Sequence, residues 1–401
     1  MMVLYINSVN YGSTGNIMFN LSDMLQKQGD QSVCATGFTL HKRDRADAVL
    51  IGGLVSKAFH MYAARLFGNH GFYSKCATRR LIKNIEAWHP DVIHLHNIHG
   101  WYLNMPALFG YFKKSNIPVV WTLHDCWSFT GHCPYFDIVG CDKWKTGCHD
   151  CPQYGEYPRS LVDNSKYMYR LKKKWFTGVK DLTIVTPSEW LAGLVKQSFL
   201  KDYPVRVIHN GIDLSVFKPT PSQFREKYGI GDKYLVLGVA FGWGKRKGLD
   251  VFIELAKRLD PTRYCIVLVG TDDAVDKQLP EGIISIHRTQ DQTELAEIYT
   301  AADVFANPTR EENYPTVNME AIACGTPVLT FRTGGSPEIL DETCGAVVPC
   351  DDVDAMEQEI IRICETRPYC EAACLEKAKS FDKDARFREY IELYEVLNGE
   401  K

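Results

Sequence analysis

The sequence predicts an α/β protein with two doubly wound domains. Short apolar runs rich in β-branched residues alternate with longer amphipathic stretches, which is the pattern of strands and helices. The alternation stops near residues 205–219 and then starts again. A chain of 401 residues is long enough to bury two full cores. Two successive runs of this kind therefore predict two Rossmann-like domains.

The first run contains apolar segments without internal polar residues, as expected of parallel strands covered on both faces. A helix over 16–28 places Ile17, Leu21 and Leu25 on one face. The predicted strands of this half span residues 3–6, 32–36, 91–95, 119–123 and 183–186, and a further helix begins near residue 189.

The second run predicts strands over 235–239, 265–269, 304–306 and 328–331, and helices over 249–259 and 293–302. We expect a first domain over 1–205, with a cysteine-rich insert at 126–152. We expect a second domain over 206–380 and a C-terminal helix over 381–401 that packs back on the first.

Composition excludes several classes of protein. The 46 basic and 49 acidic residues give a net charge of -3, which does not point to nucleic acid as a partner. No apolar run reaches 18 residues, so no membrane-spanning helix is predicted. The start, MMVLYINSVNYG, is typical of a buried strand and not of a signal peptide. We therefore expect a cytoplasmic protein whose 14 cysteines are thiols or metal ligands.

Two glycine-containing turns are candidate anion sites. Gly12 and Gly15 lie where the first strand passes into a helix, and such a turn either contacts a diphosphate or is only a tight connection. Lys245, Arg246 and Lys247 lie between two glycines at the predicted start of a helix, where cations oppose the helix dipole. A bound anion would explain them, and a solvated charged turn is the alternative.

Histidines follow two of the predicted strands. His124 lies at the carboxyl end of the strand over 119–123, the edge at which open α/β sheets bind ligands. It is a candidate donor of a hydrogen bond to a sugar, or else a structural histidine. His94, His96 and His99 follow another strand, and we expect a core or loop role for them. We also expect His94 and His96 to point to opposite faces, which disfavours a shared metal site.

The segment from Glu312 to Glu320 carries the most informative pattern. Pro315 favours the first turn of a helix that runs to about residue 324. The free N–H groups of that turn, with the Thr316 hydroxyl, suit a phosphate. Glu312 in the preceding loop could accept hydrogen bonds from a sugar, and Glu320 from a ribose. Acidic capping of a helix is the alternative, but it does not account for Glu320.

These residues resemble the retaining glycosyltransferases of family 4. The motif E-x7-E is present as Glu312 to Glu320, and HNGIDLSVFKP, KRKGLDVFIELAKRL and LAEIYTAADVFANPT are similar to other family segments. TLHDCWSFTGHC and GCHDCP resemble the branch that builds bacterial exopolysaccharide, O-antigen and colanic acid. The resemblance implies the GT-B fold, with an acceptor-binding first domain and a nucleotide-sugar-binding second domain.

The resemblance also implies roles for individual residues. Glu312 and the backbone of Asn313 and Tyr314 would contact the donor sugar. The diphosphate would be held by Thr316 and Lys247, and the ribose by Glu320. His124 would touch the donor sugar, and Gly12 to Gly15 the diphosphate. Transfer would retain the anomeric configuration and need no metal. Two positions depart from the family: Phe241 replaces an expected Arg, for which Arg246 or Lys245 would substitute, and Asn313 replaces a Gly.

Four cysteines form a compact cluster: Cys133, Cys141, Cys148 and Cys151 fall within residues 133–151. Four thiolates suit a tetrahedral structural zinc, and free thiols or a redox-labile pair are the alternatives. Two basic segments, residues 167–180 and the group Arg79, Arg80 and Lys83, either rest on anionic lipid or are solvated helix faces.

The predicted partners are thus a UDP- or GDP-sugar and a saccharide or lipid-linked acceptor, with peripheral contact to the inner face of the membrane. A GT-B phosphorylase and a non-catalytic sugar-nucleotide-binding protein are the competing functions. A two-domain oxidoreductase would need a fuller dinucleotide-binding fingerprint than the sequence carries.

Overall fold

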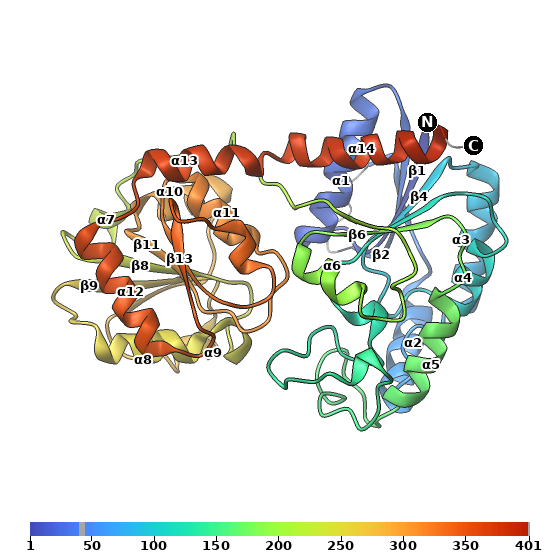
Figure 1. Ribbon diagram of the computed structural model, residues 1–401, viewed down its shortest axis with the longest axis horizontal. Helices are drawn as coiled ribbons and strands as arrows, with labels where there is room; N and C mark the ends of the chain where they lie inside the picture. Colours follow the sequence, from blue (N-terminus) through green and yellow to red (C-terminus); the bar gives the residue numbers. More distant parts are fainter. Residues whose placement is uncertain (40–44, 400–401) are drawn as a thin grey trace. The chain divides into compact units, whose positions relative to one another are not determined.

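The computed structural model describes residues 1–39 and 45–399. The chain forms two compact units: Met1–His209 with Phe387–Lys401, and Asn210–Arg386. We call them unit 1 and unit 2. Each is built on its own parallel sheet with helices on both faces (Figure 1), so the predicted α/β class with two Rossmann-like halves is confirmed.

Unit 1 contains a seven-stranded sheet in the order β3-β2-β1-β4-β5-β6-β7. The order reverses between β1 and β4, which places a topological switch point at their carboxyl ends. The strands are β1 Met2–Val9, β2 Gln31–Phe38, β3 Ala48–Leu50, β4 Val92–Leu95, β5 Val119–Thr122, β6 Leu182–Thr186 and β7 Val205–Val207.

The helices of unit 1 cover both faces of this sheet (Figure 1). They are α1 Gly12–Lys27, α2 Leu54–Phe67, α3 Lys75–Trp88, α4 Met105–Phe112, α5 Ser165–Phe176, α6 Glu189–Val195 and most of α14 Lys383–Gly399. The last of these buries Phe387, Tyr390, Ile391 and Tyr394 in one apolar cluster with β1 and β4. This packing attaches the end of the chain to unit 1.

Unit 2 contains a six-stranded sheet in the order β10-β9-β8-β11-β12-β13. Its switch point lies between β8 and β11. The strands are β8 Tyr234–Val239, β9 Tyr264–Val269, β10 Ile283–Ile286, β11 Val304–Asn307, β12 Val328–Phe331 and β13 Gly345–Val348. The helices are α7 Phe224–Lys227, α8 Leu249–Arg258, α9 Asp273–Asp276, α10 Gln292–Ala301, α11 Thr316–Ala323, α12 Val353–Thr366 and α13 Glu371–Ala378.

Short 3-10 turns complete the chain: η1 Trp127–Phe129, η2 Lys143–Lys145, η3 Lys245–Lys247, η4 Ser336–Ile339 and η5 Lys379–Phe381. The turn η3 contains Lys245, Arg246 and Lys247 directly before α8, which begins at Leu249 as predicted. Gly248, with φ +75°, separates them from Leu249. None of the helices in the described residues has the length and apolar character needed to cross a bilayer.

Candidate functional site

The carboxyl ends of β8 and β11 in unit 2 bring Lys247 and Glu312 together. Lys247 Nζ lies 2.5 Å from Glu312 Oε2, and the Asn313 amide donates to Glu312 Oε1 at 3.1 Å. Both side chains are about one-fifth exposed. Burial alone would raise the pKa of Glu312, but Lys247, the Asn313 amide and the charge of Arg246 together outweigh it and hold that pKa below its usual range. The site therefore contains an ionised, fixed pair.

Arg310, which sequence reasoning missed, joins the two loops of this site. Its guanidinium makes two parallel hydrogen bonds to Asp250, at 2.8 and 2.9 Å, and also donates to Asp351 and to the Lys245 carbonyl. Its amide donates to the Arg246 carbonyl at 2.9 Å. Arg310 is itself only 8% exposed. The turn η3 is thus held against the loop that carries Glu312 by a buried, bidentate arginine.

Gly334 and Gly335 contact the loop that carries Glu312. Gly334 has φ +54°, and a Cβ there would lie 1.7 Å from the Glu312 carbonyl oxygen. The Gly335 amide donates to the Asn313 carbonyl at 2.8 Å. Only a residue without a side chain fits at position 334, so this glycine sets the position of the Glu312 backbone.

The helix α11 begins directly after this loop, with Pro315 as its N-cap and no acidic residue in its first turn. Its first N–H groups have no partner within the helix and can bind an anion. Thr316 stands at the first helical position, so Pro315, which was predicted within the first turn, instead precedes it as the N-cap. Asn313 and Tyr314 are buried just before it, and the Tyr314 carbonyl accepts from Asn210 Nδ2 at 3.4 Å.

Glu320 lies one turn further along α11. Burial raises its pKa to about 7, against weaker lowering by hydrogen bonds from Thr316 and Tyr299. The Tyr299 hydroxyl donates to Glu320 Oε2 at 3.2 Å. Glu320 is therefore a partly buried carboxyl group beside the Thr316 hydroxyl, suited to accept hydrogen bonds from a diol.

Phe241 occupies the position of the expected Arg, and its side chain is fully exposed, at 100%. Arg246 instead approaches the acidic loop. Its Nη1 donates to the Glu311 carbonyl at 3.2 Å, and its charge contributes to lowering the pKa of Glu312. Arg246 and Lys245 were both proposed to replace the missing Arg. The structure shows a side-chain contact with the loop that carries Glu312 for Arg246.

In unit 1, Gly12 and Gly15 lie in the first turn of α1. Gly12 has φ +66°, and a Cβ on Gly15 would lie 2.7 Å from the Asn10 carbonyl carbon. The N-cap, Tyr11, makes no side-chain capping bond, and the first turn of α1 has no acidic residue. These features leave the start of α1 open to an anion.

His124 lines a hollow at the carboxyl ends of β4 and β5, together with His96, His99 and Asp125. His96 Nδ1 and His124 Nε2 are 3.2 Å apart, and His99 Nε2 is 2.8 Å from Asp125 Oδ2. Burial lowers the pKa of His124 to about 4, with a smaller opposing effect of Asp125. His124 is therefore neutral at neutral pH and can donate or accept a hydrogen bond.

His94 and His96 correct the expectation that they point to opposite faces. Their ring centroids lie only 4.1 Å apart, because residues two apart in an extended chain share a face. His94 is fully buried, with its two ring nitrogens bonded to Tyr394 and Thr122 at 2.6 and 2.8 Å. It is a core histidine, as expected by default.

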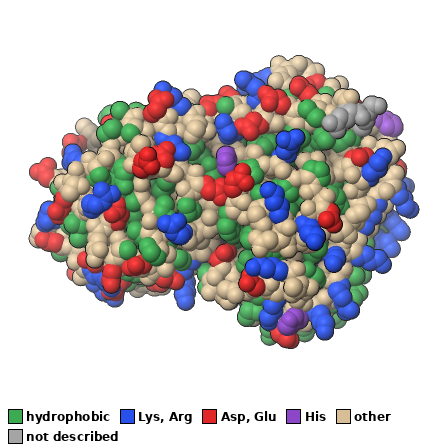
Figure 2. Space-filling model, in the orientation of Figure 1, with side chains coloured by type: hydrophobic (Ala, Val, Ile, Leu, Met, Phe, Trp, Pro, Cys, Tyr) green, Lys and Arg blue, Asp and Glu red, His purple; other side chains and the backbone are tan. Residues whose placement is uncertain are grey.

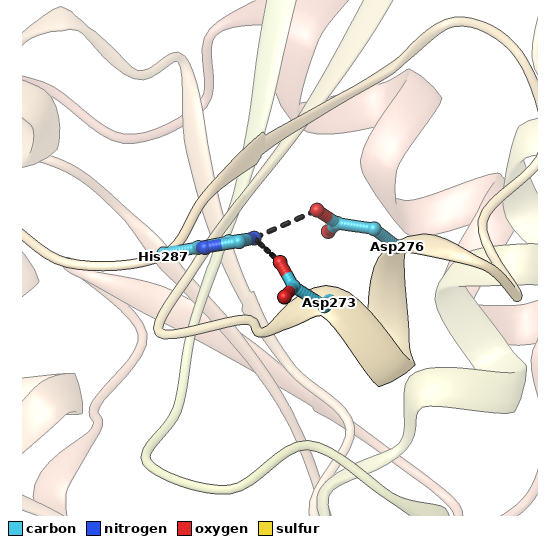
Figure 3. A group of neighbouring side chains, drawn as sticks. All are labelled: Asp273, Asp276 and His287. Atoms are coloured by element: carbon cyan, nitrogen blue, oxygen red, sulfur yellow. Dashed lines mark hydrogen bonds and ion pairs between the residues drawn. The ribbon is translucent and has the colours of Figure 1, made fainter.

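The cysteines of the insert, Cys133, Cys141, Cys148 and Cys151, line one hollow in unit 1. In the described residues, three metal-ligating atoms within 4.8 Å of one another occur only at Asp273, Asp276 and His287. Figure 3 shows that group, on α9 and just after β10. All three of its residues are exposed, and His287 is paired with Asp276 at 2.7 Å. This ion pair explains the group without a metal.

Comparison with known proteins identifies the family of the chain. Residues 14–216 match Glycosyltransferase Family 4, and residues 233–366 match Glycosyl transferases group 1. WcaC of Escherichia coli K12, a glycosyl transferase assigned to colanic acid biosynthesis, is 26% identical over 74% of this chain and 71% of its own. A GDP-mannose-dependent mannosyltransferase of Mycolicibacterium smegmatis is 36% identical over 36% of this chain and 43% of its own.

Solved structures share the fold at lower identity. Sucrose-phosphate synthase from Thermosynechococcus elongatus has a TM-score of 0.74 at 17% identity and full coverage of both chains. HepE of Anabaena, solved with UDP-glucose, has a TM-score of 0.68 at 14% identity, covering 99% of this chain and 100% of that one. The fold is GT-B, and the chain belongs to Glycosyltransferase Family 4.

Proposed function

We propose that this glycosyltransferase moves a sugar from a nucleoside diphosphate donor to a saccharide or lipid-linked acceptor, with retention of configuration and without a required metal. It would act in the synthesis of a bacterial surface polysaccharide. The observation that carries the proposal is the Lys247–Glu312 pair at the start of α11. It places a cation, a carboxylate and free helix N–H groups at one edge of the sheet in unit 2.

Each group at that edge has a proposed partner on the donor. The diphosphate is bound by Lys247, Arg246, Thr316 and the first N–H groups of α11. Glu312 and the backbone of Asn313 and Tyr314 bind the sugar, and Glu320 accepts from both ribose hydroxyls. For unit 1, His124 is proposed to contact the donor sugar, and Gly12 and Gly15 the diphosphate.

The proposed reaction breaks the bond between the anomeric carbon and the diphosphate oxygen. The acceptor hydroxyl forms its new bond on the same face of the sugar, and its proton passes to the leaving phosphate. Positive charge at Lys247 and the dipoles of the helix start stabilise the negative charge that develops on the diphosphate. Glu312 is held by Lys247 and the Asn313 amide, an arrangement that suits binding of hydroxyls better than nucleophilic attack.

A donor screen tests this proposal. Purified protein is mixed with UDP-, GDP- and ADP-sugars, and both saturable binding and slow release of nucleoside diphosphate are measured. Proton NMR of the transferred sugar then reports whether the anomeric configuration is retained. Formation of a sugar 1-phosphate from a saccharide and inorganic phosphate, without release of nucleoside diphosphate, would establish a phosphorylase instead. Binding without any turnover in the presence of acceptors would establish a binding protein. Activity in excess chelator checks metal independence.

We also propose a surface of unit 1 that contacts the membrane. It combines exposed apolar residues of α2 with the basic residues of α3. In α5, Met168, Tyr169, Trp175 and Phe176 are buried, so its aromatic side faces the core. In α2, by contrast, Val55, Phe59, Tyr62 and Leu66 are 51% to 85% exposed and follow one helix face. We call these four residues the α2 stripe.

The next helix, α3, exposes Lys75, Arg79, Arg80 and Lys83. Figure 2 shows Lys and Arg side chains gathered along the part of unit 1 that carries this helix. An apolar stripe followed by a basic helix suits an anionic bilayer surface. Co-sedimentation with phosphatidylglycerol vesicles is expected for the wild type. It is expected to fall in F59S/L66S and to stay unchanged in V396S, which alters an exposed valine on α14. Equal binding by F59S/L66S would remove the proposal.

A further inference from the structure

The segment from Thr130 to Asn164 holds its shape with almost no regular structure. Its only helical or strand element is the three-residue turn η2. Loops of this length without secondary structure are uncommon in compact domains and need a separate source of order. The segment nevertheless buries Trp144, at 1% exposed, and Phe136, at 6%. Turn hydrogen bonds, such as the one from the Cys141 amide to the Phe136 carbonyl, hold parts of the segment, but no helix or sheet ladder runs through it.

The four cysteines of this segment face a common hollow. Cys133 is buried in it, and Cys141, Cys148 and Cys151 are half-buried. All four are free thiols. They come from three separate stretches of the segment, so the fold and not merely the sequence assembles them.

The sulfur of Cys148 is held by the backbone. The Gly131 amide donates to Cys148 Sγ at 3.1 Å. A Cβ on Gly131 would lie 2.7 Å from Cys148 Cβ and 2.4 Å from the Ser165 carbonyl oxygen. A glycine is therefore required for this approach. Hydrogen bonds from the surroundings to a ligand atom are what orients the ligands of protein metal sites.

Polar groups around the hollow lack partners. His132, Trp144 and Ser165 line it with the cysteines, and each is at most 4% exposed. His132 Nε2, Trp144 Nε1 and Ser165 Oγ have no hydrogen-bond partner. Buried polar atoms without partners are costly and mark a place where another group belongs.

We propose that Cys133, Cys141, Cys148 and Cys151 bind a structural zinc ion that fixes the 130–164 segment. Four thiolates are a closed ligand set that leaves no open position, so the ion would hold the loop and take no part in sugar transfer. Zinc–sulfur bonds of about 2.3 Å place tetrahedral thiolates roughly 3.8 Å apart. The four sulfurs are spread wider than this. Binding therefore has to draw them together, which a segment without regular structure allows.

Metal content tests the proposal directly. We expect zinc equimolar with the purified chain by elemental analysis, and loss of most of it in C148S. Two variants serve as controls: C370S changes an exposed cysteine elsewhere, and H287A disrupts the surface group of Figure 3. Both are expected to retain zinc. Zinc lost in H287A and kept in C148S would overturn the assignment.

Two measurements on the wild type avoid dependence on a variant that fails to fold. Replacement of zinc by Co²⁺ is expected to give the thiolate charge-transfer bands and the strong visible bands of a tetrahedral sulfur site. Chelation is expected to expose the 130–164 segment to limited proteolysis while the rest of the chain stays resistant. Absence of metal after refolding with zinc, or a Cys133–Cys151 disulfide in the native protein by mass spectrometry, would refute the proposal.

Discussion

Lys247 and Glu312 are separated by 65 residues, yet Nζ of the first lies 2.5 Å from Oε2 of the second. The pair joins the turn after β8 to the loop after β11, across the switch point of the unit 2 sheet. A donor whose diphosphate binds Lys247 and whose sugar binds Glu312 has to replace this ion pair with two new contacts. The pair fixes both side chains, and Lys247 helps to hold the pKa of Glu312 below its usual range.

Lys247→Ala tests the leaving-group role. Removing the cation is expected to lower kcat by at least about 100-fold, because charge on the departing diphosphate loses its main stabilising partner. Initial rates of nucleoside diphosphate release at saturating donor measure this. Lys245→Ala is the matched control, since Lys245 is an exposed neighbour in the same turn, and it is expected to keep most of the activity. Full turnover by Lys247→Ala would refute the assigned role.

Gly334→Ala tests whether the glycine sets the position of the Glu312 loop. The added Cβ would collide with the Glu312 carbonyl oxygen at 1.7 Å. We expect loss of donor binding by calorimetry and a fall in the free energy of unfolding. Gly282→Ala is the control, since its φ is also positive, at +96°, but nothing lies within 4 Å of the new Cβ. It should cost only about 1–2 kcal/mol for the left-handed backbone. Equal behaviour of the two variants would contradict the steric argument.

The sequence predicted the fold and the start of α11 because strands buried on both faces and helix starts leave local patterns. Pro315 and the apolar run after it located α11 to within a residue. Arg310 could not be recognised in this way. It looks like one more surface charge until the fold brings Asp250 and Asp351, 60 and 41 residues away, to its guanidinium. The α2 stripe was missed because an apolar helix face normally predicts burial.

The attachment of α14 to unit 1 depends on His94. Tyr394→Phe removes the hydroxyl 2.6 Å from His94 Nδ1 and leaves a buried ring nitrogen without its partner. A loss of about 1–3 kcal/mol in the free energy of unfolding is expected, as for other unsatisfied buried groups. Urea titration measures it. Tyr390→Phe removes a longer bond, 3.3 Å to Thr122, and should cost less. If the order is reversed, the His94–Tyr394 bond is not what anchors the helix.

Glu320 gives the protein a specific pH dependence. Burial raises the pKa of its carboxyl group from 4.5 to about 7, so between these values the folded chain holds a proton that the unfolded chain has released. The free energy of unfolding must then fall as pH rises through that window, by up to about 1.4 kcal/mol per pH unit. Glu320→Gln removes this fall, and urea titrations of both proteins across the window measure the difference. Glu281→Gln, which changes an exposed carboxylate, is the control and should follow the wild type. Because a ribose diol donates to the ionised form, donor affinity of the wild type should rise as pH passes 7, and that of Glu320→Gln should not. Parallel curves of unfolding free energy against pH for wild type and Glu320→Gln would show that Glu320 is not protonated in the folded chain. Parallel curves of donor affinity against pH would show that it is not the ribose ligand.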